Sequence, residues 1–200
     1  MSSPQDRAAV AAQLRTETYD LLSRSGLFGR LDTAFGGEAM VTGSASYDLM
    51  VWRDIDIHLA IEQERWRDWM AFGATLAKLF AELGMPLHGA NYLNDWVDPH
   101  PLGAGLYWGL AFKDRKGDRW NIDLWGWDPF DYAVRQARDF SLRTDLAACD
   151  RDLILRLKTE ARAQPGYHGV TLTSFDIYQC CIAGGGDSLD AVAAWKAAQD

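Results

Sequence analysis

Apolar and polar residues alternate in two short stretches of the chain, and each alternation predicts a half-buried strand. Residues 54–59 read Asp-Ile-Asp-Ile-His-Leu, and residues 120–125 read Trp-Asn-Ile-Asp-Leu-Trp. Successive side chains of a strand point to opposite faces of a sheet. The branched apolar residues of the first stretch therefore share one face, while Asp54 and Asp56 share the other. In the second stretch the polar face carries Asp123.

Other stretches predict a mixture of helices and further strands. Apolar residues at helical spacing predict helices over 8–23, 62–83, 130–140, 146–162 and 174–183, with a short last helix that includes Trp195. The apolar stripes of the first two helices include Val10 and Met70. Short apolar runs predict strands over 40–42, 87–96, 104–112 and 119–127, the last two joined as a hairpin. Segments 32–38, 98–103 and 164–166 contain Gly or Pro and predict loops or helix ends.

This order of elements predicts an α+β fold, with a mixed sheet flanked by helices. A chain of 200 residues forms one domain, or a core with a small appendage. We expect a core over residues 1–128 and a C-terminal helical subdomain over 129–200 that packs on it. No Pro- or Ser-rich linker separates the two parts.

Charge and cysteine content limit the partners and the compartment. The net charge of −8 disfavours a general nucleic-acid binder, because phosphate neutralisation needs clustered Lys and Arg. Three cysteines without a C-x-x-C pair do not make a disulfide framework, which fits a reducing compartment. Neither a secretory leader nor a run of membrane-spanning length is recognisable. We therefore expect a cytoplasmic protein without a membrane partner, and its oligomeric state is left open.

The acidic residues on the polar faces predict a metal site. Asp54 and Asp56 are about 6.6 Å apart along one face of a strand, and like charges at this spacing repel unless a cation lies between them. Asp is depleted in strands, although the solvated outer face of an edge strand is an alternative explanation. Carboxylate oxygens are the ligands that magnesium prefers. If the strand of Asp123 lies beside the first, the three carboxylates are enough to hold two ions.

A small-residue turn precedes the acidic strand, where residues 41–46 read Val-Thr-Gly-Ser-Ala-Ser. Gly43 can adopt backbone angles closed to other residues, and Ser44 adds a hydroxyl. Successive backbone N–H groups in such a turn form a concavity that binds anions such as phosphate. An ordinary turn is the simpler interpretation of Gly-Ser alone. The acidic strand that follows it favours phosphate binding.

Taken in order, Gly43-Ser44, the Asp54/Asp56 pair and Asp123 resemble the motifs of the polymerase-beta-like nucleotidyltransferase superfamily, which includes small stand-alone antibiotic nucleotidyltransferases. The resemblance covers about residues 40–127. It implies transfer of a nucleoside monophosphate from a nucleoside triphosphate to an acceptor hydroxyl, with release of pyrophosphate.

The resemblance also implies roles for individual residues. Asp54, Asp56 and Asp123 would be the catalytic ligands of two magnesium ions, and Gly43 and Ser44 would hold the outer phosphates. In this superfamily a basic residue of the C-terminal helices often reaches the triphosphate, and Lys158 is the candidate here. An exposed surface lysine is the alternative interpretation of Lys158.

The chain departs from the superfamily directly after the turn. Many relatives carry an Arg there that helps to hold phosphate, whereas residues 45–48 read Ala-Ser-Tyr-Asp. The replacement charge would come from Arg53, from Lys158 or from a basic cluster on the hairpin, formed by Lys113, Arg115, Lys116 and Arg119.

The acceptor and the activity itself have alternatives. A small-molecule acceptor is favoured over nucleic acid, and the acidic chain would suit a cationic one such as an aminoglycoside. The alternative function is that of a catalytically weak protein of the same fold that acts as a binding or regulatory partner, for example in a toxin–antitoxin pair.

Overall fold

A five-stranded mixed sheet forms the centre of the computed structural model, which describes residues 3–98, 103–164 and 172–199. The strands are β1 (Met40–Thr42), β2 (Asp54–Ala60), β3 (Leu87–Asn94), β4 (Gly105–Lys113) and β5 (Arg119–Trp127). Their order across the sheet is β1-β2-β5-β4-β3. β2 and β5 run parallel, and the other neighbours run antiparallel. The predicted α+β fold with a mixed sheet is confirmed.

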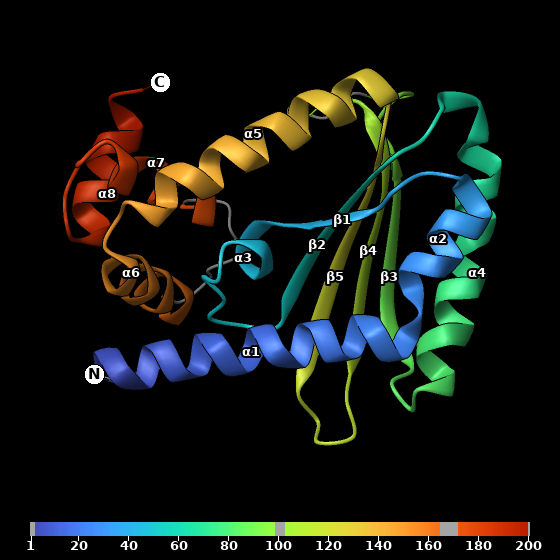
Figure 1. The fold of residues 1–200 in the computed structure, drawn as a ribbon, viewed down its shortest axis with the longest axis horizontal. Coiled ribbons are helices and arrows are strands. Elements are labelled where there is room, and N and C mark those ends of the chain that lie inside the picture. The colour runs from blue at the N-terminus through green and yellow to red at the C-terminus, as the bar shows by residue number, and fades with distance from the viewer. Residues whose placement is uncertain (1–2, 99–102, 165–171, 200) are drawn as a thin grey trace.

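Most helices lie either against the sheet or beyond its end. They are α1 (Pro4–Ser25), α2 (Leu27–Phe35), α3 (Gly43–Ser46), α4 (Trp66–Glu82), α5 (Pro129–Ala147), α6 (Arg151–Ala163), α7 (Ser174–Ile182) and α8 (Leu189–Ala197). Figure 1 shows α6, α7 and α8 at one end of the molecule and α2 and α4 at the other, with α1 and α5 running between the two ends. Among the described residues, no helix combines the length and apolar character needed to cross a bilayer.

The main core lies between one face of the sheet and the helices α1, α2 and α4. Ile55, Ile57 and Leu59 of β2 are completely buried, as the alternation predicted, and so are Ile122 and Leu124 of β5. The helices contribute Leu21, Leu27, Leu31, Trp69, Phe72, Leu76 and Phe80 to the same cluster. The opposite face of β2 and β5 carries the acidic residues.

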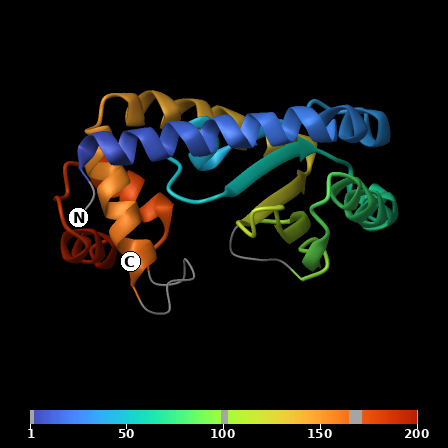
Figure 2. The same ribbon diagram turned by 90° about the horizontal axis from the view of Figure 1, so that it is seen from below.

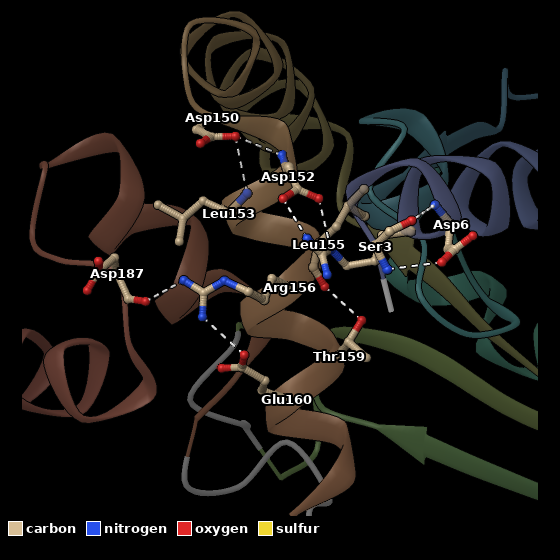
Figure 3. A network of polar contacts seen from close by, with 11 residues as sticks. Ser3, Asp6, Asp150, Asp152, Leu153, Leu155, Arg156, Thr159, Glu160 and Asp187 are labelled. Carbon is tan, nitrogen blue, oxygen red and sulfur yellow. Dashed lines mark hydrogen bonds and ion pairs between the residues drawn. The ribbon is translucent and has the colours of Figure 1, made fainter. Parts of the chain in front are cut away.

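A second core joins α6, α7 and α8, and the start of α1 belongs to it. Ala11 of α1 is completely buried in this cluster. Nearby, the Arg7 guanidinium donates to both oxygens of the Asp152 carboxylate at 2.8 and 2.6 Å. Figure 3 shows this region, in which Arg156 of α6 also bonds Glu160 and the carbonyl of Asp187. α1 therefore contacts both cores, and the boundary at residue 128 stays a prediction.

Two residues predicted for apolar stripes lie in solvent. Val10 of α1 is 49% exposed and Met70 of α4 is 53% exposed. The two helices occur where they were predicted, but the side that each turns toward the core does not include these residues. In α4 the buried residue next to Met70 is Trp69, which is completely enclosed. Since apolar residues surround these positions in the sequence, the pattern alone did not fix the orientation of the helix.

Several element bounds also differ from the prediction. The segment 32–38 is not all loop, because α2 continues to Phe35 before Gly36 ends it in a left-handed conformation. β3 ends at Asn94 rather than at residue 96. The helix predicted over 130–140 extends to Ala147, and the next begins at Arg151, since the Asp150 side chain accepts from the amides of residues 152 and 153. Of the predicted loops, residues 99–102 and 165–166 lie outside the described residues.

Candidate active site

The parallel pairing of β2 and β5 brings the acidic residues together. Asp56 is the Cα partner of Asp123, and Asp54 is the partner of Asn121. Neighbouring strands are about 4.8 Å apart, so Asp56 and Asp123 lie side by side on the face opposite the core. Two segments more than sixty residues apart in the sequence thus supply one patch of three carboxylates, as the motif requires.

Burial and mutual repulsion make these carboxylates costly to ionise. Burial raises the pKa of Asp123 to about 6, and the charge of Asp54 adds to the effect. The Tyr107 hydroxyl donates to Asp123 Oδ1 at 2.7 Å and opposes this rise. Burial, followed by the charges of Asp54 and Asp123, raises the pKa of Asp56 well above its usual range. The pKa of Asp54 is raised by burial as well. The patch would therefore be stabilised by a cation.

The donor types at this patch fit magnesium, which prefers carboxylate oxygens. Within residues 3–98, 103–164 and 172–199, no three His, Cys, Asp or Glu side chains come close enough together to hold a metal ion. Asp123 is held by Tyr107 instead. Gathering the three carboxylates around an ion would require their side chains to rotate.

The Gly-Ser turn lies directly against Asp56. β1 pairs with β2 so that Thr42 is the Cα partner of Asp56, and the next residue, Gly43, turns the chain into α3 with φ of +63°. A Cβ atom on Gly43 would lie 2.1 Å from Asp56 Oδ2. Glycine is needed here for both the backbone angle and the close approach. The predicted turn is observed as the single-turn helix α3, in which Ser44 is half-buried.

Lys158 of α6 is buried behind the same turn, with 1% of its surface exposed. Its Nζ donates to Ser44 Oγ at 2.9 Å, to the Leu49 carbonyl at 2.7 Å and to the Tyr178 hydroxyl at 2.7 Å. Burial lowers the pKa of Lys158 to about 7, and the charges of the nearby carboxylates oppose this shift. The alternative of a surface lysine is therefore wrong. All three donors of the ammonium group hold protein atoms, so Lys158 fixes Ser44 in place.

Two cavities meet at Asp54, Thr173 and Ser174. The turn-side cavity has a volume of about 310 Å³ and is lined by Gly43, Ser44 and Asp56 together with Phe175 and Tyr178 of α7. The sheet-side cavity has a volume of about 760 Å³ and is lined by Asp123, Asn121 and Arg119 of β5 together with Asn91, Gly109 and Ala111. The carboxylates stand between the two cavities, so ligands in both would meet there.

Comparisons with known proteins agree with this arrangement at the level of the fold. No family model and no curated protein matches the chain. Among solved structures, a variant of Cid1 poly(U) polymerase bound to MgATP has a TM-score of 0.53 at 15% identity, covering 88% of this chain and 53% of that one. Terminal uridylyl transferase 4 from Trypanosoma brucei with bound CTP has a TM-score of 0.43 at 15% identity, covering 90% and 56%. The chain has a polymerase-beta-like nucleotidyltransferase fold.

The nucleotidyltransferase fold that the motifs implied is thus confirmed. The chain spans about half the length of these solved structures, with coverage of 53% and 56%. At such low identity the likeness concerns the fold, and any activity has to be argued from the side chains of the site.

The structure narrows the choice of residues that could supply a phosphate-binding charge in place of an Arg directly after the Gly-Ser turn. Arg53 is paired with Glu17 at 2.9 Å and with Asp118 at 3.0 Å, so its charge is already used. Arg162 was not predicted. It is exposed, lines the sheet-side cavity and lies 4.8 Å over the Trp52 ring. Its position four residues after Lys158 on one helix face was the signal that could have found it.

Asp139 of α5 is a further residue that the sequence did not mark. It is 7% exposed and accepts hydrogen bonds from the hydroxyls of Thr42 and Tyr47, which stand on either side of the Gly-Ser turn. Arg143 pairs with Asp139 at 3.2 Å and donates to Ser46 Oγ at 3.1 Å. Through these contacts, α5 holds both ends of the Gly43-Ser44 turn in place.

Proposed function

We propose that the protein is a nucleotidyltransferase that moves a nucleoside monophosphate from a nucleoside triphosphate to an acceptor hydroxyl and releases pyrophosphate. The observation that carries this proposal is the register that sets Asp56 beside Asp123, with Gly43 against the Asp56 carboxylate. The fold shared with Cid1 poly(U) polymerase supports it.

Asp54, Asp56 and Asp123 would hold two magnesium ions. When bound, the ions would neutralise charge on the phosphates and lower the pKa of the acceptor hydroxyl. The raised pKa values of the carboxylates support this role, because a divalent cation relieves the repulsion among neighbouring negative charges.

The triphosphate would lie along the Gly43-Ser44 turn in the turn-side cavity. Lys158 holds the Ser44 hydroxyl and adds positive charge behind it. Arg162 would supply the charge that the resemblance places directly after the turn, since it is exposed and lines the sheet-side cavity, which meets the turn-side cavity at Asp54, Thr173 and Ser174. Phosphate binding by guanidinium groups is favoured by their two parallel N–H donors.

The acceptor would enter from the sheet-side cavity, with its hydroxyl at Asp123. Tyr107 keeps Asp123 Oδ1 oriented by a hydrogen bond, and a carboxylate held in this way beside the hydroxyl would accept its proton. We expect a small molecule as the acceptor, because the net charge of −8 disfavours binding of a nucleic-acid chain. A cytoplasmic location would fit the three cysteines, all of which are free.

The test is a transfer assay with each labelled nucleoside triphosphate, magnesium, and pools of small molecules and RNA. We expect magnesium-dependent release of pyrophosphate, and a loss of at least about a thousandfold in Asp56→Asn and Asp123→Asn, since each carboxylate supplies several kcal/mol. Asp20→Asn is the control, because this carboxylate is 62% exposed on α1. Full activity in both site variants would end the proposal.

The same assay separates the alternative function. Nucleotide binding without release of pyrophosphate from the triphosphate, whichever acceptor is added, would support the catalytically weak binding or regulatory protein. The absence of an Arg at positions 45–48 favours that alternative. Titration of ATP with and without magnesium measures the binding directly.

A further inference from the structure

The open face of β3, β4 and β5 has a floor of small residues that begins at the catalytic patch. The strand registers place Asp56, Asp123, Gly109 and Asn91 in one row across four strands. Beside this row, Asn121 pairs with Ala111. Gly109 cannot be enlarged, since a Cβ atom there would lie 2.4 Å from the Tyr107 hydroxyl that bonds Asp123. Gly109 therefore accommodates the Tyr107 side chain that holds Asp123, and Ala111 and Asn121 line the cavity beside it.

The charge of this floor changes sign along β5. Asp123, Asn121 and Arg119 follow one another on the same face, and four residues at about 3.3 Å each put Arg119 about 13 Å from Asp123. Lys113 of β4 is the Cα partner of Arg119, so a second cation stands directly opposite the first. Like charges in this position destabilise a strand pair. Arg119 therefore puts positive charge at one end of the sheet-side cavity, whereas the carboxylates lie at the other end, together with Arg162.

The two cations lack acidic partners. Arg119 donates to Asn121 Oδ1 at 3.4 Å, which is a long hydrogen bond, and among the described residues neither Arg119 nor Lys113 forms an ion pair. The other two cations of the hairpin differ, since Arg115 and Lys116 line a separate cavity that contains Glu17, Asp20 and Glu82. Of the basic cluster, Arg119 therefore lines the sheet-side cavity, and its strand partner Lys113 lies beside it on the same face of the sheet.

We propose that the sheet-side cavity is the acceptor subsite and that it takes a hydroxyl compound that also carries a phosphate group. This inference rests on the proposed function. The hydroxyl would lie at Asp123 and the phosphate at Arg119 and Lys113. Two adjacent cations match the double charge of a phosphate monoester, and the carboxylates at the other end repel it. The charge pattern therefore sets both the class of acceptor and its direction in the cavity.

The transfer step itself is unchanged by this assignment. The acceptor oxygen forms a bond to the α-phosphorus of the nucleotide, the bond from that phosphorus to the bridging oxygen of pyrophosphate breaks, and the proton of the hydroxyl passes to Asp123. The phosphate of the acceptor takes no part in the reaction. A polycationic aminoglycoside would meet repulsion at the Arg119 end, so this inference differs from the expectation based on net charge.

The experiment compares matched acceptors with labelled ATP, UTP and magnesium. The pairs are ribose 5-phosphate with ribose and AMP with adenosine, and the further acceptors are the RNA dinucleotide UpU and kanamycin. We expect the phosphate-bearing member of a pair to have at least a tenfold higher kcat/KM. Arg119→Ala and Lys113→Ala should each reduce that advantage at least threefold, and leave the KM of the nucleotide unchanged. Arg115→Ala and Lys116→Ala remove the same charge from the same hairpin and should have no effect.

A binding measurement separates this inference from the proposed function. Ribose 5-phosphate and AMP are titrated calorimetrically, without nucleotide substrate, into the wild type, Asp56→Asn and Arg119→Ala. Binding by Asp56→Asn that is weakened in Arg119→Ala supports the subsite even if no transfer is detected. A preference for ribose, adenosine or kanamycin overturns the subsite and leaves the transferase standing, and so does an Arg119→Ala defect of equal size on both members of a pair. Preference for UpU alone would assign the phosphate to an RNA end and contradict a small acceptor.

Discussion

The two faces of the same sheet have opposite effects on stability. On one face, Ile55 and Ile57 of β2 are completely buried under the helices, and each such side chain contributes about 1.5–3 kcal/mol. On the other, burial raises the pKa of both Asp54 and Asp56, and the charges of Asp54 and Asp123 add to the rise at Asp56. Alternate residues of β2 thus have opposite effects: the buried isoleucines stabilise the fold, and the aspartates between them destabilise it when they are ionised. Strain of this kind is typical of catalytic sites.

The largest expected effect comes from comparing two adjacent residues. Ile57→Ala should lower the free energy of unfolding by about 2–5 kcal/mol, since it opens a cavity in the core at a completely buried position. Asp56→Asn should leave that free energy unchanged or raise it in the absence of metal, because it removes a charge that Asp54 and Asp123 repel. Urea denaturation in EDTA measures both.

Magnesium should make the wild type more stable than Asp56→Asn, the reverse of the order expected in EDTA. Added to the wild type, it should raise the unfolding midpoint, and added to Asp56→Asn it should have less effect, because a ligand that binds only the folded state stabilises it. An Asp56→Asn variant as unstable as Ile57→Ala would show that the polar face is structural, and would contradict the division between the two faces.

The next effect tests why glycine occupies position 43. Gly43→Ala and Gly36→Ala both place a Cβ atom on a left-handed backbone, with φ of +63° and +69°, which costs about 1–2 kcal/mol. Gly36 has open space around it, whereas the new atom at position 43 would displace the Asp56 carboxylate. Gly36→Ala should lose about this much stability and Gly43→Ala at least as much, and only Gly43→Ala should also lose transferase activity, at least tenfold. Thermal melts and pyrophosphate release are the two measurements.

Equal activity in these two alanine variants would mean that the close approach of the turn to Asp56 has no part in the chemistry. The comparison with Gly36→Ala removes backbone strain as an explanation, since both positions share it.

Local patterns in the sequence were enough to predict the strands and the acidic residues. β5 runs over Arg119–Trp127 as predicted, because alternation is a property of neighbouring residues. The turn and the acidic strand are also close together in the chain, so their motif was visible. The parallel pairing of β2 with β5 was not visible, since it joins segments separated by β3 and β4. Helix α2 was missed because it is only nine residues long and has Gly29 inside it.

Residues that reach the site from the C-terminal helices were the hardest to predict. Asp139 lies between Arg138 and Phe140 on α5 and has no motif around it, yet it bonds Thr42, 97 residues away in the sequence. Lys158 has apolar neighbours, and the sequence left open whether it is buried. Its hydrogen bond to Ser44 spans 114 residues. Figure 2 shows α5 running beside α1, and α6 at the end of the molecule where α7 and α8 lie. Such contacts depend on the packing of the two cores, which no local pattern encodes.

The smallest expected effect concerns the buried ammonium group that links the second core to the polar face. Burial lowers the pKa of Lys158 to about 7 in the folded protein, whereas an unfolded lysine has a pKa of about 10.4. Below pH 7 both states carry the proton and the folded state bears the full cost of the buried charge. Between the two pKa values the folded state has released the proton and the unfolded state has not, so stability increases with pH.

Relative to Lys158→Met, the wild type should therefore gain about 1 kcal/mol in unfolding free energy between pH 7 and pH 8. Lys78→Met is the control, since the Lys78 side chain is 79% exposed and should show no such slope. Urea denaturation at several pH values, in EDTA, gives the curves. Parallel curves for the wild type and Lys158→Met would mean that Lys158 stays charged at pH 8. In that case the carboxylates of the polar face, rather than burial, control its proton, and the two sides of the Gly-Ser turn would have to be treated as one electrostatic unit.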